Sequence, residues 1–155
     1  MPKPFLTVRR YPYEEPLNTQ IEISASNGFF AGTTDIYCAV QDLVEIGGGL
    51  KNFPKTADDE YRYEHRSEDP ALRCYRYFLL RAYTTDAVGH SALQIKMNCN
   101  ASQPNEGMCE FSIRAEAAAI NRLGGLLEEF SKLGHLELHW RLDEGELFED
   151  LQPNV

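Results

Sequence analysis

The sequence lacks the long apolar segments and the short catalytic motifs that identify many proteins at first reading. No stretch reaches about 18 consecutive apolar residues, and residues 1–10 contain no apolar run of signal-peptide length. A Walker loop, a dinucleotide-binding glycine signature and a metalloprotease motif are also absent. We therefore expect a cytoplasmic protein that does not bind a membrane.

Cysteine is scarce, and its spacing excludes two common uses. The four cysteines are Cys38, Cys74, Cys99 and Cys109. None forms a Cys-x-x-Cys pair, which excludes a zinc ribbon and a thioredoxin-type redox motif. Each lies in or beside an expected strand, where a reduced cysteine acts as a small apolar side chain. The sequence thus predicts free thiols, consistent with the cytoplasm, and no cofactor.

Positive charge is also limited, because 15 Lys and Arg residues face 24 Asp and Glu residues, for a net charge of -9. A nucleic-acid backbone requires a basic surface, so we expect no nucleic-acid partner. The charge suits a basic partner protein, since opposite fields steer association, although acidity also serves solubility alone. The 155 residues, 43% hydrophobic, predict one α+β domain over residues 1–142 and an acidic C-terminal tail over residues 143–155.

Alternation of apolar and polar residues predicts several β-strands. Ile21, Ile23 and Ala25 alternate with polar neighbours, and Asn27-Gly28 then signals a tight turn into a partner strand. The expected strands cover residues 20–25, 29–38, 72–84, 92–99, 109–114 and 136–140, and residues 5–11 and 60–66 are short candidate strands. Short turns between consecutive strands favour antiparallel pairing.

Two segments have helical periodicity. In the segment 116–134, apolar residues recur at steps of three and four, and Gly134 provides the stop. A second helix is expected over residues 39–53, where Pro54 ends it. Two helices are too few to cover both faces of a sheet. The predicted fold is therefore α+β, with a mostly antiparallel sheet of about six or seven strands and two amphipathic helices on one face.

The two helical segments also resemble each other at a shift of 77 positions, which aligns adjacent glycines within both helices. The similarity reflects either coincidence between amphipathic helices or a duplicated strand-strand-helix unit. Because glycine costs about 1 kcal/mol in a helix relative to alanine, a packing reason is expected. We predict that Gly47 or Gly48 approaches the other helix near Gly124 or Gly125.

Tyrosine and arginine alternate along the strand expected over residues 72–84. One parity of this strand is apolar and should face the helices, so Tyr75, Tyr77, Arg81 and Tyr83 should point away from them. Tyr and Arg are enriched at the centres of protein interfaces. This row is the predicted binding surface, for a partner protein or for a second copy of the chain in a homodimer. An ordinary solvated sheet face is one alternative, and a surface that stacks single-stranded bases is another, which the acidic charge places last.

Two weaker clusters could carry chemistry. His135, Glu137 and His139 project from one face of a strand and are weak candidates for a metal site, although the two histidines would lie about 13 Å apart. Asp86 and His90 flank a turn together with a serine, but a serine elbow motif is missing. We therefore predict no catalytic residues and no metal.

The order of these signals resembles a loose group of small bacterial α+β domains, some similar to immunity proteins of polymorphic toxin systems. The similarity rests on residues 27–32 entering a strand, a helix ending in residues 50–54, residues 86–90 before an alternating strand, and the late helix. The chain departs from the pattern in having no tryptophan before Trp140. The resemblance implies a non-enzymatic inhibitor that binds one toxin, and it transfers no functional residue.

The leading hypothesis is thus a non-enzymatic protein-binding module, in particular an immunity-type inhibitor whose partner is a basic toxin domain. Two alternatives remain open at this point: a small metal-dependent hydrolase, or a small-ligand-binding protein.

Overall fold

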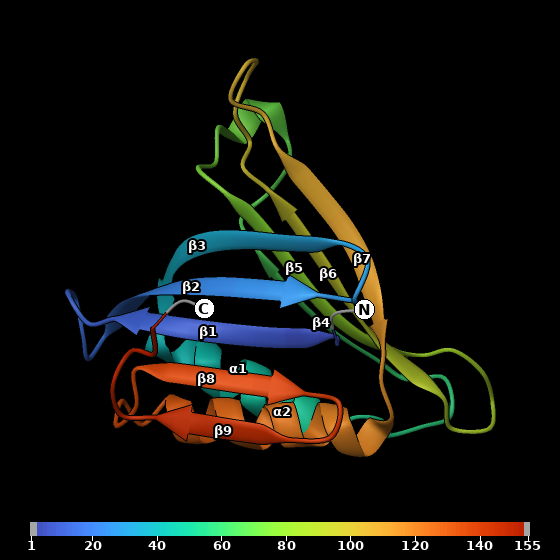
Figure 1. Ribbon diagram of the computed structural model, residues 1–155. Helices are drawn as coiled ribbons and strands as arrows, with labels where there is room; N and C mark the ends of the chain where they lie inside the picture. The colour runs from blue at the N-terminus through green and yellow to red at the C-terminus, as the bar shows by residue number, and fades with distance from the viewer. Residues whose placement is uncertain (1–2, 154–155) are drawn as a thin grey trace.

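The protein consists of two antiparallel β-sheets and a pair of helices (Figure 1). The computed structural model describes residues 3–153. The first sheet has the strand order β3-β2-β1-β8-β9 and the second has the order β4-β5-β6-β7. The strands are β1 (Phe5–Tyr11), β2 (Asn18–Ser26), β3 (Ala31–Ala39), β4 (Glu60–His65), β5 (Tyr77–Thr84), β6 (Ser91–Asn98), β7 (Met108–Arg114), β8 (Glu137–Arg141) and β9 (Gly145–Phe148). The predicted α+β class is confirmed, with the strands divided between two sheets instead of forming one.

The first sheet buries one face, as the alternation in its sequence predicts. Ile21, Ile23 and Ala25 of β2 are buried, whereas the residues between them remain partly exposed. In the register of the sheet, Ile23 lies between Val8 of β1 and Thr34 of β3, so one continuous row of side chains faces the core.

The strand β5 of the second sheet begins later than the expected residue 72. Residues Pro70–Leu72 form a short 3₁₀ turn, η1, in which the Ala71 backbone N–H donates to the Asp69 carboxylate at 3.0 Å. Arg73 follows with a left-handed φ of 49°, which extended strand geometry cannot accommodate. The strand β5 therefore starts at Tyr77, and Phe78, Leu80 and Ala82 face the core as expected.

The two helices, α1 (Val40–Lys51) and α2 (Ala117–Phe130), pack directly against each other. A Cβ atom added to Gly124 would lie 2.6 Å from the Gly47 carbonyl oxygen and 2.4 Å from the Lys51 amide nitrogen. A Cβ atom added to Gly47 would lie 3.0 Å from the Gly124 carbonyl oxygen. The predicted approach of these glycines is confirmed, and it brings backbone against backbone.

The structure contains an internal repeat with approximate two-fold character. Each half is a three-stranded meander, a helix and one more strand, and the strand after the helix joins the sheet of the other half. The starts of β3 and β7 (31 and 108), of α1 and α2 (40 and 117) and of β4 and β8 (60 and 137) are each 77 residues apart. The paired glycines, Gly47 and Gly124, obey the same shift, so the sequence similarity has a structural counterpart.

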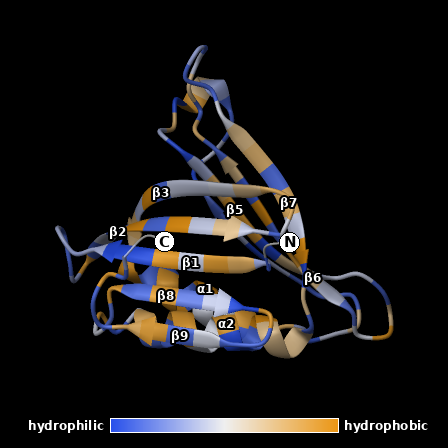
Figure 2. Ribbon diagram, viewed as in Figure 1, coloured by the Kyte–Doolittle hydropathy of each residue, from blue (hydrophilic) through white to orange (hydrophobic). Residues whose placement is uncertain are grey.

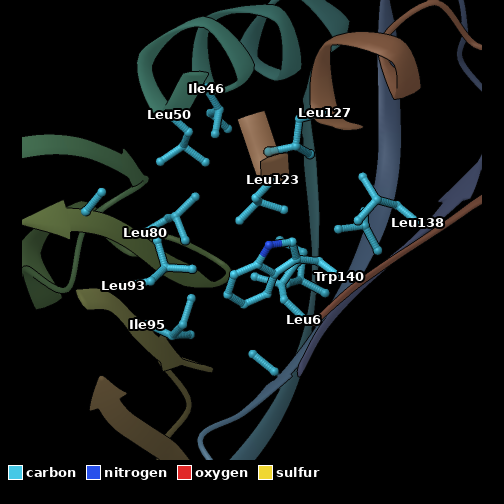
Figure 3. Close-up of a cluster of buried hydrophobic side chains, with 14 of the residues drawn as sticks. Leu6, Ile46, Leu50, Leu80, Leu93, Ile95, Leu123, Leu127, Leu138 and Trp140 are labelled. Carbon is cyan, nitrogen blue, oxygen red and sulfur yellow. The ribbon is translucent and has the colours of Figure 1, made fainter. Parts of the chain in front are cut away.

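The core forms where both sheets and both helices converge (Figure 3). Trp140 of β8 is completely buried there, and its indole N–H donates to the Ala119 carbonyl oxygen of α2 at 2.8 Å. Figure 2 shows the corresponding alternation of hydrophobic and hydrophilic residues along the strands of the first sheet. Complete burial of the indole, with its N–H satisfied, fixes β8 against α2.

One buried charge links the first sheet to the end of α2. The Arg10 side chain, only 4% exposed, donates to the carbonyl oxygens of Leu133 and His135 and forms an ion pair with Glu15. The guanidinium also lies 5.9 Å from the centre of the Phe130 ring. These contacts satisfy carbonyl groups of the segment that connects α2 to β8.

The acidic C-terminal segment contains more structure than its composition suggests. Residues 145–148 form β9, which pairs with β8 as an edge strand, where we expected a tail over residues 143–155. Residues 152 and 153 then lie against the outer face of the first sheet, beside β1 and β8. In the described part of the chain, neither helix is long and apolar enough to span a membrane.

Candidate functional site

The predicted tyrosine and arginine row lies on the outer face of the second sheet, but its members differ in exposure. Tyr75 precedes β5 and is 55% exposed, with its ring 4.9 Å from the Arg76 guanidinium. Tyr77 lies on β5 and is only 3% exposed. Arg81 and Tyr83 follow on the same face and are half-buried. The alternation along β5 is as expected, whereas exposure of Tyr77 is not observed.

The side chains of Arg81 and Tyr83 already interact with neighbouring side chains of the sheet. The Arg81 Nε donates to Gln94 at 2.7 Å, and its guanidinium forms an ion pair with Glu60 at 3.4 Å. The guanidinium also stacks over the Tyr83 ring at 4.1 Å, and the Tyr83 hydroxyl lies 3.0 Å from the Ser112 hydroxyl. A carboxylate of a partner would have to compete with these contacts.

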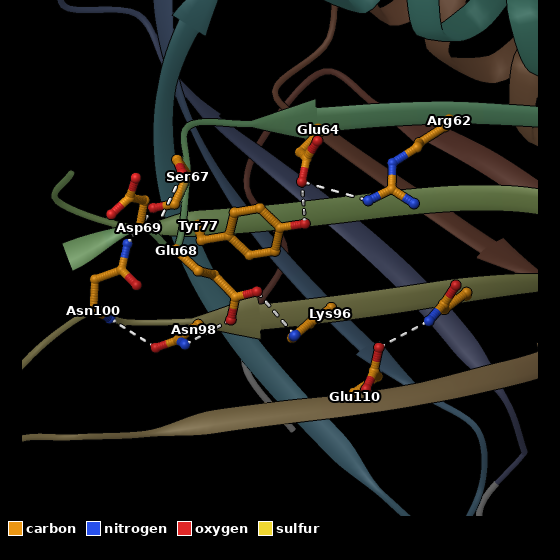
Figure 4. A network of polar contacts seen from close by, with 11 residues as sticks. Arg62, Glu64, Ser67, Glu68, Asp69, Tyr77, Lys96, Asn98, Asn100 and Glu110 are labelled. Atoms are coloured by element: carbon orange, nitrogen blue, oxygen red, sulfur yellow. Dashed lines mark hydrogen bonds and ion pairs between the residues drawn. The ribbon is translucent and has the colours of Figure 1, made fainter. Parts of the chain in front are cut away.

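A polar network explains the burial of Tyr77 (Figure 4). The Tyr77 hydroxyl donates to Glu64 at 2.6 Å, and the Lys96 ammonium lies 6.0 Å from the centre of its ring. Burial and the Glu64 hydrogen bond raise the pKa of Tyr77. Hydrogen bonds from Asn98 and Lys96 lower the pKa of the Glu68 carboxyl. Charges of opposite sign are therefore paired within this face, which is typical of a solvated surface.

The structure brings together two of the three weak metal candidates. Glu137 and His139 lie on β8, and the Glu137 Oε2 is 2.7 Å from the His139 Nε2. His135 lies before the strand. The Glu137 carboxylate is 1% exposed and also pairs with Arg9 Nε at 2.5 Å. The backbone N–H of Gln152 donates to it at 3.3 Å. The carboxylate therefore holds β1, β8 and the C-terminal segment together.

A polar cavity of about 320 Å³ adjoins this cluster on the outer face of the first sheet, between the side chains of β1, β2 and β8. Thr7 lies directly opposite His139 in the register. The imidazole is 38% exposed and is oriented by a buried carboxylate, an arrangement that suits a positioned base. The same Glu137 carboxylate also forms an ion pair with Arg9, so it has a structural role besides orienting His139.

The second weak cluster forms a turn. The Asp86 carboxylate accepts the Val88 and His90 backbone N–H groups and lies 2.5 Å from the His90 ring. The hydrogen bond and the charge of Asp86 raise the pKa of His90. Ser91 is buried and donates to the Ala115 carbonyl oxygen, so it does not join the pair. The three residues do not form a nucleophilic triad.

Sulfur atoms gather at a third place, a cavity of about 240 Å³ between β3 and the ends of β6 and β7. Met97, Cys99 and Cys109 are among its lining residues, and a Cβ added to Gly32 would lie 2.3 Å from Cys109 Sγ. Burial raises the pKa of the Cys109 thiol, which keeps it protonated. Within residues 3–153, no group of three or more His, Cys, Asp or Glu side chains is placed to hold a metal ion.

The β8–β9 hairpin carries the densest negative charge of the chain. Its segment from residue 143 to residue 150 contains no basic residue and five exposed acidic residues, namely Asp143, Glu144, Glu146, Glu149 and Asp150. Among the described residues, the only ion pair of these five joins Glu144 to Arg141 at 3.8 Å. The sequence reveals this charge, whereas its presentation on an ordered edge hairpin emerges only from the structure.

Comparisons with known proteins identify no family. No family model matches the chain, and no curated protein matches it. One solved structure, the plant transcriptional regulator PBF-2, is similar over 84% of this chain and 76% of its own, with a TM-score of 0.47 and 10% sequence identity.

Proposed function

We propose that this chain is a non-enzymatic protein-binding module that docks on a basic partner protein through the acidic β8–β9 hairpin. Where the partner is a toxin domain, docking makes the chain an immunity-type inhibitor that covers the active surface of the toxin. The resemblance of the sequence to immunity proteins agrees with this proposal.

The observation that carries the proposal is the unbalanced charge of the hairpin. The outer face of the second sheet pairs its charges internally, as Arg81 does with Glu60 and Lys96 with Glu68. The hairpin instead presents five exposed carboxylates with a single long ion pair. Uncompensated charge produces a strong local field, which accelerates encounter with a partner of opposite charge.

The order of the hairpin strengthens this argument. β9 pairs with β8 over residues 145–148, and β8 is fixed to the core through Trp140. A Cβ added to Gly145 would lie 2.4 Å from Leu126 Cδ1, so the hairpin packs closely on α2. A surface that is already ordered loses less conformational entropy on binding than a mobile tail would.

The test neutralises the hairpin without changing its shape. The variant E144Q/E146Q/E149Q is compared with the control E14Q/E45Q/E106Q, which neutralises three exposed carboxylates on other elements. For the binding partner we would choose a purified basic toxin domain whose gene neighbours the gene of this chain. We expect the hairpin variant to bind about tenfold more weakly at low ionic strength, mainly through a slower association rate.

The control variant should lose much less affinity, and the difference between the two variants should shrink as salt is added. Equal losses in the two variants would show that net charge alone acts and that the hairpin is not the binding site. For the immunity version, co-expression of the wild-type chain should protect cells from the toxin. If the hairpin variant protects cells from the toxin as well as the wild-type chain does, the immunity version of the proposal is contradicted.

A further inference from the structure

We infer that the turn between β2 and β3, with its exposed residues Phe29 and Phe30, is the apolar anchor that inserts into the basic partner. This inference rests on the proposed function and names the residues that would hold the complex together. The two phenylalanines are 73% and 65% exposed, although phenylalanine is among the residue types most often buried.

Hydrogen bonds hold the backbone of this turn in a fixed position. The Asn27 carboxamide oxygen accepts the backbone N–H groups of Phe29 at 2.9 Å and Phe30 at 2.8 Å. The Asn27 N–H donates to the Phe30 carbonyl oxygen at 3.1 Å, and the Ser26 hydroxyl accepts the Gly28 N–H at 3.0 Å. Gly28 has a φ of 95°, which favours glycine.

A further hydrogen bond fixes the turn to the second sheet. The Asn27 side-chain amide donates to the Ser112 carbonyl oxygen of β7 at 3.3 Å. The turn is therefore supported by both sheets, although it lies at the surface. Aromatic side chains have few rotatable bonds, so on an ordered loop they lose little entropy on binding, as the residues of a binding hot spot do.

The position of the turn relative to the acidic hairpin indicates the chemistry of the partner. Ala31, Ser26, Phe5 and Arg141 are successive partners across β3, β2, β1 and β8. The β2–β3 turn and the β8–β9 turn thus lie at the same end of the first sheet, as Figure 1 shows. Three strand spacings separate the middles of the two hairpins, roughly 14 Å, well within one protein interface.

The matching surface on the partner is an apolar pocket bordered by Lys and Arg side chains. Phe29 and Phe30 would fill the pocket, while Asp143 and Glu144 would face its basic border. Apolar anchors at the centre of an interface mainly slow dissociation, whereas charges at its rim mainly speed association.

The test removes the rings and compares them with equally exposed apolar residues at the opposite end of the sheet. F29A/F30A is paired with the control Y13A/L17A, whose side chains are 82% and 76% exposed in the wild type. Binding to the same purified basic toxin domain as in the charge test is measured over a series of salt concentrations. Circular dichroism verifies that both variants remain folded.

We expect F29A/F30A to bind at least about 30-fold more weakly, through faster dissociation, with the salt dependence of the wild type. The control should bind within about twofold of the wild type. Wild-type affinity of F29A/F30A, with the hairpin variant still impaired, would overturn the anchor and leave the proposed function intact. No binding by the wild-type chain would overturn both.

Self-association is the remaining outcome. A wild-type dimer in sedimentation that F29A/F30A converts to monomer, with unchanged partner binding, would assign the rings to an interface between two copies of this chain. That result would also refute the inference.

Discussion

Replacement of Gly124 by alanine tests the helix contact on which the repeat is built. The added Cβ would lie 2.4 Å from the Lys51 amide nitrogen and 2.6 Å from the Gly47 carbonyl oxygen. Ordinary contacts begin at 3.4 Å, so the helices must separate by about 1 Å. Both neighbours are backbone atoms, and no side-chain rotation relieves the overlap.

The magnitude follows from two opposing effects. Overpacking a close contact costs about 1–3 kcal/mol, and contact with rigid backbone belongs at the upper end. Alanine regains about 1 kcal/mol of helix propensity. We expect G124A to lower the free energy of unfolding by about 2 kcal/mol, which corresponds to about 4–8 °C in Tm for a chain of this size.

The adjacent glycine supplies the control. A Cβ at Gly125 meets no atom within 4 Å, so G125A should raise the free energy of unfolding by about 0.5–1 kcal/mol. Urea titrations followed by the fluorescence of Trp140, the only tryptophan, would measure both variants. If G124A proves as stable as G125A, the helices do not meet through their glycines and the reasoning fails.

Two further predictions concern buried groups. R10M should lower the free energy of unfolding by about 3–5 kcal/mol, because it leaves Glu15, 10% exposed, without its ion-pair partner. R10M/E15Q should recover part of that loss in a double-mutant cycle, and a strictly additive loss would argue against the pair. Burial raises the pKa of the Cys38 thiol to about 12, so Cys38 should resist alkylation at pH 8 in the folded protein and react once urea unfolds it. Rapid modification of Cys38 in the folded state would show that it is accessible.

The local elements of this fold are largely predictable from the sequence. The alternation of Ile21, Ile23 and Ala25 predicted β2, and the apolar periodicity after residue 116 predicted α2. Mid-helix glycines predicted a close approach, because only a packing contact compensates their cost. These signals are local, so they need no knowledge of the rest of the chain.

The remaining features depend on contacts between distant segments. The exchange of β4 and β8 between the sheets follows from long-range pairing, which no local pattern encodes. Burial of Tyr77 results from Glu64 and Lys96 on neighbouring strands. The sequence does not predict the strand β9, because its acidic flanks resemble a solvated tail, whereas pairing with β8 and packing on α2 give it order.

The repeat itself indicates where function should be sought. The parts that recur at 77 residues, β3 with α1 and β4 and their counterparts, build the scaffold and bury its core. Two features have no counterpart in the other half: the edge strand β9 with its acidic flanks, and the tight turn at Phe29 and Phe30, whose equivalent between β6 and β7 is a longer polar loop. One acidic flank of β9, the β8–β9 turn with Asp143 and Glu144, lies at the same end of the first sheet as the Phe29 and Phe30 turn. The repeated parts supply most of the buried core, so an acidic turn and two exposed rings that occur once, at the same end of one sheet, fit a surface shaped for a partner.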